Sequence, residues 1–117
     1  MAMQPTEFGG AVPVDGYGPG FFRVGGQVTR GPVLVTAAGG QPWGGIGDEA
    51  ALMALAGSVD VLFLGMGAQI ARAPAPLIEA LEQAGVMVEV TASPAAARSY
   101  NVTLSEGRRV ACALIPV

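Results

Sequence analysis

The chain has no histidine, no lysine and a single cysteine, Cys112, among its 117 residues. Without histidine, the Ser–His and Cys–His nucleophile pairs cannot be built, and neither can the usual transition-metal sites. A lone cysteine cannot form an internal disulfide, and Cys112 stands in an apolar run where thiols usually pack as small hydrophobic groups. The sequence therefore argues against an ordinary hydrolase or metalloenzyme, and we expect no cofactor.

Charge is also scarce. Only 13% of the residues are charged, and nine carboxylates against six arginines give a formal net charge of -3. Such a chain has no dense cationic surface that could neutralise a run of phosphates, so we expect no nucleic-acid binding.

Long hydrophobic runs are missing as well. The longest, residues 59–66 and 110–115, fall far short of the roughly 20 residues needed to cross a bilayer. The first eight residues lack the basic start and the apolar block of an export signal. Together with the unpaired cysteine, these absences predict a cytoplasmic protein with no membrane span.

The residues that are abundant describe a globular domain. Half of the chain is apolar, at 51%, and 18 glycines with 9 prolines supply turns. A chain of this length builds one core without a metal or disulfide. We expect an irregular, Gly- and Pro-rich arm over residues 1–19 and one compact α/β domain over residues 20–117.

The first part of this domain reads as an antiparallel ribbon. Two short strands, residues 21–24 and 27–30, flank Gly25-Gly26, a pair that accepts the positive φ angles of a tight hairpin. Residues 33–36 are expected to add a third strand. A loop over residues 37–47 then contains Trp43, which is expected either to pack onto the sheet or to contact a ligand.

The second part alternates between strands and helices. Residues 59–64 are apolar at nearly every position, which is typical of a strand covered on both faces in a parallel sheet. Asp48 and Ser93 are expected to cap helices, the first a short one and the second one that runs to about Ser105. The predicted order is strand, helix, strand, helix, strand, over residues 59–64, 77–84, 86–90, 93–105 and 110–115. This order implies two right-handed crossovers onto a parallel sheet covered by helices.

A candidate ligand site follows from this topology. Loops that leave the carboxyl ends of parallel strands form the usual binding crevice, and here they contain Gly65, Gly67, Arg72 and Ser93. Arg72 and the helix start at Ser93 would both favour a small anionic ligand or an acidic partner segment. The alternatives are that Arg72 is a solvated charge and that the glycines form a tight turn, since the three-glycine spacing of a dinucleotide loop is absent.

A second charged group stands near the carboxyl terminus, where Glu106 is followed by Arg108 and Arg109. A carboxylate beside arginines is more typical of an ion pair than of acid–base chemistry, because arginine is a poor proton donor at neutral pH. We therefore expect no catalytic residues here.

Several short motifs, in order, resemble the Mth938-like family of small α/β proteins. They are Phe22-Arg-Val-Gly-Gly26, Gly31-Pro-Val-Leu-Val35, Trp43, Leu64-Gly-Met-Gly67, Tyr100-Asn-Val, Glu106-Gly-Arg-Arg-Val110 and Leu114-Ile-Pro116. The resemblance spans roughly residues 20–116, although residues 36–40 lack the proline that often follows the third strand. The family includes a mitochondrial assembly factor of NADH:ubiquinone oxidoreductase and the adipogenesis-associated domain-containing protein. The resemblance implies a role in assembly, and it gives no catalytic residues to transfer to this sequence.

Two functions stay open at this point. The first is a non-enzymatic binding or assembly module that recognises a protein partner through apolar patches around Phe21, Phe22 and Trp43, in the biogenesis of a respiratory or other membrane complex. The second is a small-molecule binder, or an enzyme of unrecognised type, that acts at the strand-end crevice. Exposed strands of the hairpin could also pair two copies into a homodimer.

Overall fold

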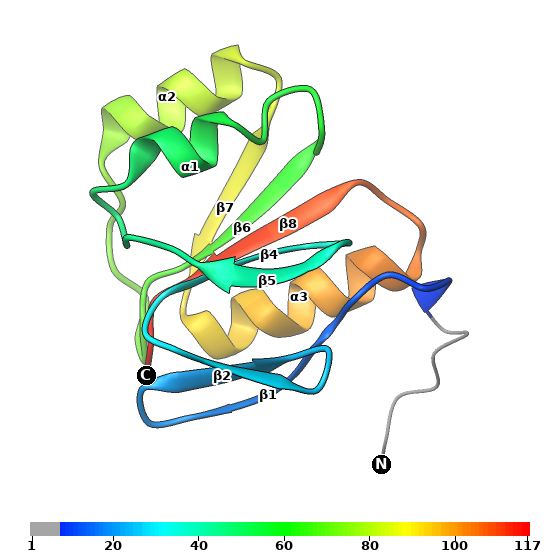
Figure 1. Cartoon of the computed structure of the whole chain (residues 1–117). Helices are drawn as coiled ribbons and strands as arrows, with labels where there is room; N and C mark the ends of the chain where they lie inside the picture. The colour runs from blue at the N-terminus through cyan, green and yellow to red at the C-terminus, as the bar shows by residue number, and fades with distance from the viewer. Residues whose placement is uncertain (1–7) are drawn as a thin grey trace.

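The structure is a computed structural model that describes residues 8–117, so the first seven residues of the expected arm lie outside the described part. Residues 8–117 form eight strands and three helices (Figure 1). Their bounds are β1 Val14–Gly18, β2 Phe21–Val24, β3 Gln27–Arg30, β4 Val33–Thr36, β5 Gly39–Pro42, α1 Glu49–Met53, β6 Val61–Gly65, α2 Ala75–Gln83, β7 Met87–Thr91, α3 Ser93–Ser105 and β8 Val110–Leu114. Within residues 8–117, no helix has the length and apolar content to cross a membrane.

A five-stranded sheet forms the centre of the molecule, with the strand order β5-β4-β8-β6-β7. β6 pairs in parallel with β7 on one side and with β8 on the other. Helices α1 and α2 lie on one face of this sheet and α3 lies on the opposite face (Figure 1). The predicted α/β class, with an antiparallel hairpin followed by a βαβαβ unit, is confirmed.

The place of β4 differs from the prediction. It joins the central sheet, antiparallel to β8, instead of forming a third strand of the ribbon. Its residues Val33, Leu34 and Val35 are all buried, on both faces of the strand. A half-exposed ribbon cannot cover three consecutive apolar residues, whereas a strand between two layers can. β5, in the segment expected to be loop, extends this edge by pairing with β4.

The ribbon gains a different third strand. β1 lies within the segment expected to be an irregular arm, and it pairs with β2, while β3 pairs with the other edge of β2. The arm prediction was therefore wrong for Val14–Gly18, because glycines in and beside the strand hide its pattern. The turn at Gly25-Gly26 has φ angles of 57° and 81°, as the hairpin prediction requires.

Strand β8 separates two hydrophobic clusters. Val110, Cys112 and Leu114 face the cluster under α3 and the small sheet. Ala111 and Ala113 face the cluster under α1 and α2. All five residues of β8 are buried, which is the both-face burial expected for a central strand. The core therefore consists of two layers that meet at one strand.

Polar side chains of α3 attach the small sheet to the central sheet. The Tyr100 hydroxyl donates a hydrogen bond to the Val12 carbonyl oxygen at 2.8 Å. Asn101 makes two hydrogen bonds to the backbone of Val14, donating to its oxygen at 2.8 Å and accepting from its N–H at 2.9 Å. These bonds satisfy backbone groups at the start of β1 that the sheet leaves unpaired.

We predict that Tyr100→Phe lowers the free energy of unfolding by about 1–2 kcal/mol, because it leaves the Val12 carbonyl without its donor beside a buried ring. Chemical denaturation with urea measures the change. The matched control is Tyr17→Phe, on a half-exposed ring whose hydroxyl makes no hydrogen bond within residues 8–117, and it should change stability by less than about 0.5 kcal/mol. Equal effects of the two substitutions would contradict this role for the hydroxyl.

Candidate functional site

The predicted strand-end crevice is filled by the protein itself. Ser93, the first residue of α3, is fully buried. Its hydroxyl donates to the Ile115 carbonyl oxygen at 2.6 Å and accepts from the Gly67 N–H at 2.9 Å. The Ser93 N–H donates to the Gly67 oxygen at 2.7 Å. The hydroxyl therefore joins three segments of the chain, and Ala92, not Ser93, is the N-cap residue of α3.

Gly65 allows this close approach. A Cβ atom at Gly65 would lie 2.6 Å from the Ser93 Cα and 3.0 Å from the Leu114 Cδ2. Neither neighbour can withdraw easily, because one is backbone and the other belongs to the core. The Gly65-Met66-Gly67 turn is thus a packing contact between the end of β6 and the start of α3.

The predicted site residues do not surround a common cavity. Gly65, Gly67 and Ser93 come together by direct contact, Arg72 lies exposed in the loop before α2, and Trp43 is buried in the cluster on the α1/α2 face. The anion hypothesis stays a prediction, but it would have to use groups other than the Ser93 hydroxyl and the Gly67 N–H.

The predicted apolar patch around Phe21, Phe22 and Trp43 was wrong. Phe22 is 0% exposed and Trp43 is 4% exposed, and they belong to clusters on opposite faces of the central sheet. Phe21 is half-buried, with the Arg30 guanidinium 5.9 Å from the centre of its ring. These aromatic side chains therefore offer little surface to a partner. Of the two possibilities for Trp43, packing onto the sheet is the one that the structure shows.

Asp48 occupies the N-cap position of α1, as predicted, but its oxygen atoms hold the Trp43 loop. Its carboxylate accepts a hydrogen bond from the Gly44 N–H at 3.2 Å, and its carbonyl oxygen accepts one from the Trp43 Nε1 at 3.2 Å. It makes no side-chain capping bond to α1. The indole N–H is thereby satisfied while the ring is buried, as a buried tryptophan requires.

The core holds two groups that could ionise, and burial disfavours the charged form of both. Burial raises the pKa of the Cys112 thiol well above its ordinary value, and it also raises the pKa of Tyr100. A buried thiol in apolar surroundings is a poor nucleophile, because the reactive form is the thiolate. Residues 8–117 also contain no cluster of three or more Cys, Asp or Glu side chains that could hold a metal ion.

The expected ion pair near the carboxyl terminus has a different acid. Arg109 binds Asp60, with Nη2 donating to Oδ1 at 2.6 Å, and it also donates to the Gly57 oxygen at 3.0 Å. The hydrogen bond from Arg109 holds the pKa of Asp60 below its usual value. Because both side chains are more than half exposed, this pair ties the start of β8 to the start of β6 at little energetic gain.

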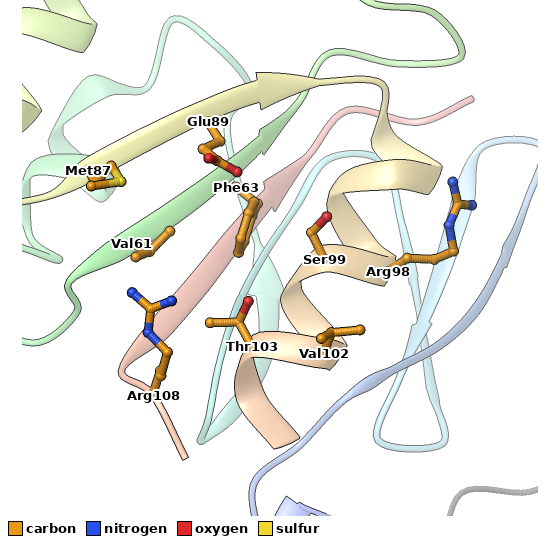
Figure 2. A pocket seen from close by; sticks show the side chains of 9 residues that line it. All are labelled: Val61, Phe63, Met87, Glu89, Arg98, Ser99, Val102, Thr103 and Arg108. Carbon is orange, nitrogen blue, oxygen red and sulfur yellow. The ribbon is translucent and has the colours of Figure 1, made fainter. Parts of the chain in front are cut away.

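An open groove lies on the α3 face of the sheet, between the edge strand β7 and helix α3 (Figure 2). We call it the β7–α3 groove, and its volume is about 550 Å³. It is lined by Val61, Phe63, Met87, Glu89, Arg98, Ser99, Val102, Thr103 and Arg108. These side chains come from β6, β7, α3 and the turn before β8 (Figure 2).

The groove combines an apolar floor with charged ends. Val61 and Phe63 form the floor, and Met87 and Val102 expose 58% and 60% of their surfaces at its two sides. Glu89 stands near Phe63, while the Arg108 guanidinium is directed toward Val61 (Figure 2). The arrangement suits contact with another apolar surface and contains no pairing of a nucleophile with a base.

Sequence reasoning missed this groove. Val102 was available as a signal, because it follows Arg98 by four residues and so interrupts the polar stripe of α3. Met87 gave no signal, since residues 86–90 were expected to belong to a sheet covered by helices. Its exposure depends on β7 being an edge strand, which the order of strands along the chain does not reveal.

Comparisons with known proteins agree with this architecture. The model of a family described as "Protein of unknown function (DUF498/DUF598)" matches residues 14–115. The chain belongs to this family. A solution structure of a Bordetella pertussis protein, a Mth938-like domain, superimposes with a TM-score of 0.78 over 99% of this chain and 91% of that one, at 24% identity. This likeness concerns the fold, and the suspected resemblance is confirmed.

Two curated relatives are similar in sequence. An uncharacterised protein of Rhodobacter capsulatus is 56% identical over 117 residues, which cover all of this chain and 94% of that protein. NADH dehydrogenase (ubiquinone) 1 alpha subcomplex assembly factor 3 of Danio rerio is 32% identical over 122 residues, covering 97% of this chain and 69% of the fish protein. The chain is thus a distant relative of a respiratory-complex assembly factor.

We predict that Gly65→Ala lowers the free energy of unfolding by about 1–3 kcal/mol, because the added methyl group overlaps Ser93 and Leu114 in a packed site. Thermal unfolding followed by circular dichroism measures it. Gly16→Ala in β1 is the control, since a Cβ there meets no atom within 4 Å and the residue has no positive φ. A variant at Gly65 as stable as the control would refute the close contact.

We also predict that Cys112 does not react with a thiol reagent such as dithionitrobenzoate in the folded protein. In about 6 M urea, where the core is exposed, one thiol per chain should react. Absorbance of the released thiolate gives the stoichiometry in both states. Fast modification without denaturant would show that β8 is accessible and would overturn its assignment as a buried central strand.

Proposed function

We propose that this protein is a non-enzymatic binding module that serves the assembly of a membrane-bound respiratory complex, and that it docks through the β7–α3 groove. The observation that carries the proposal is the exposure of Met87 and Val102 on either side of an apolar floor. Exposed apolar side chains gathered at one concave surface are typical of protein interaction sites.

The energetics favour a docking surface at this place. Covering a Met or Val side chain that is half exposed contributes on the order of 1 kcal/mol each, and the floor adds contacts that exclude water. Charged groups at the two ends, Glu89 and Arg108, add little affinity but select the orientation of a partner. This combination of an apolar centre and a polar rim is the usual anatomy of a transient interface.

Chemical considerations speak against catalysis at the same place. Ser99 and Thr103 supply hydroxyls to the groove, but the chain has no histidine to activate them. Glu89 is the one carboxylate of the lining, and no histidine or thiol lines the groove beside it. The relationship to an assembly factor in Danio rerio supports the same conclusion, since that name describes a helper of complex formation.

The test is complementation of a strain that lacks the gene for this chain. We expect the deletion to reduce the amount of assembled NADH:ubiquinone oxidoreductase, seen by native gel electrophoresis and in-gel activity. A Met87→Glu/Val102→Glu double variant should restore less than about one tenth of what the wild-type gene restores, because two charges in the groove oppose burial of a partner.

The control is Val28→Glu, which places the same charge on an exposed strand residue outside the groove and should restore assembly fully. Circular dichroism must show that all variants fold. An unaffected respiratory complex in the deletion strain would refute the assembly role. Full rescue by the double variant would instead refute the groove as its docking surface.

A further inference from the structure

We propose that the β7–α3 groove binds the same groove of a second copy of this chain, across a two-fold axis. The inference rests on the proposed function only in taking the groove as a docking surface. The proposed occupant of that surface is a second copy, and the supporting observation is the distribution of charge in the groove.

The groove is electrically polar along its length. Glu89, on β7, stands near Phe63, whereas the Arg108 guanidinium reaches toward Val61, two residues earlier on β6 (Figure 2). Within residues 8–117 neither side chain takes part in an ion pair, since the one salt bridge found there joins Arg109 to Asp60. Arg108 adds only a weaker long-range attraction to Asp60. Arg98, the other charged residue of the lining, extends from α3 away from Glu89 (Figure 2).

A groove with opposite charges at its ends is complementary to itself. When two copies meet face to face in antiparallel orientation, Glu89 of each copy faces Arg108 of the other. A two-fold interface repeats each contact, so two attractive pairs form at once. Between them, Met87 and Val102 of both copies are brought together and lose their exposure to water.

Partners with charge of a single sign fit less well. An acidic segment meets Glu89 and a basic segment meets Arg108, so each leaves one repulsive contact in the groove. A second copy satisfies both ends because it carries the same pattern in reverse. A second copy therefore pairs both Glu89 and Arg108, whereas a segment of one charge sign pairs only one of them.

Glu89 also favours groove-to-groove packing over pairing of the two β7 edges. β7 is the edge strand, and in the described part of the chain it pairs with β6 alone. Antiparallel edge-to-edge pairing centred on the middle residue of β7 would set two Glu89 carboxylates directly opposite each other, which is destabilising. Packing of groove against groove avoids this contact and turns Glu89 toward an arginine.

The experiment is sedimentation velocity of the purified full chain over a concentration series, at low salt. We expect a reversible dimer for the wild type. Glu89→Arg and Arg108→Glu should each weaken it by roughly tenfold or more, because each replaces two attractions with two repulsions. The double variant Glu89→Arg/Arg108→Glu should restore the dimer, since it reverses the polarity of both grooves.

A mixture of the two single variants gives the sharpest result. Each variant forms only a weak dimer with itself. The mixed dimer has two contacts between positions 89 and 108. At one contact, the arginine introduced at position 89 of one copy faces the glutamate introduced at position 108 of the other. The second contact keeps the natural Glu89 and Arg108. An equimolar mixture should therefore dimerise like the wild type. Such rescue in trans requires that the two positions face each other across the interface, which a merely structural role of either residue cannot produce.

Arg23→Glu, on an exposed residue of β2, is the control and should leave the dimer unchanged. A wild type that stays monomeric up to about 0.5 mM would overturn the proposal. A dimer insensitive to both single variants would also overturn it and would favour pairing through the hairpin edges. Either result leaves the complementation test independent, because a groove variant can fail to rescue assembly whether or not the free chain dimerises.

Discussion

The structure depends on the burial of β8 on both of its faces. Its side chains alternate between two hydrophobic clusters, and its backbone pairs in parallel with β6 and in antiparallel orientation with β4. A strand so placed needs apolar residues at every position and layers of chain above and below it. Helix α3 with the small sheet supplies one layer, and α1 with α2 supplies the other (Figure 1).

This constraint fills the interior with packed side chains. The crevice at the strand ends, where α/β proteins usually bind ligands, is occupied by the contact of Gly65 with Ser93. The one tryptophan and the one cysteine are both enclosed in the clusters. The two layers leave the α3 face of the edge strand β7 uncovered, and the exposed Met87 and Val102 line the groove there. The proposed docking at that groove uses a surface that this covering leaves exposed.

Local patterns predicted the second half of the chain well, because each of its elements shows its own period and its own stop signal. The first half was harder. Val33–Thr36 looks the same whether it ends a ribbon or joins a central sheet, and only its pairing with β8, nearly eighty residues later, decides between the two. β1 and β5 contain several glycines and were read as irregular. A related reason applies at the candidate site: the Ser93 hydroxyl was expected to cap a helix, but its partners, Gly67 and Ile115, are set by tertiary contacts that no local pattern encodes.

Native-state hydrogen exchange tests whether β8 is buried between the two layers, since it measures how far each strand must open before its amides meet water. The amides of β8 should exchange most slowly, through global unfolding, while those of the small-sheet edge strand β3 should exchange through local opening at least about a hundredfold faster. Exchange of the β8 amides as fast as those of β3 would show that β8 is not held between two hydrophobic layers, because a strand so buried cannot open by itself.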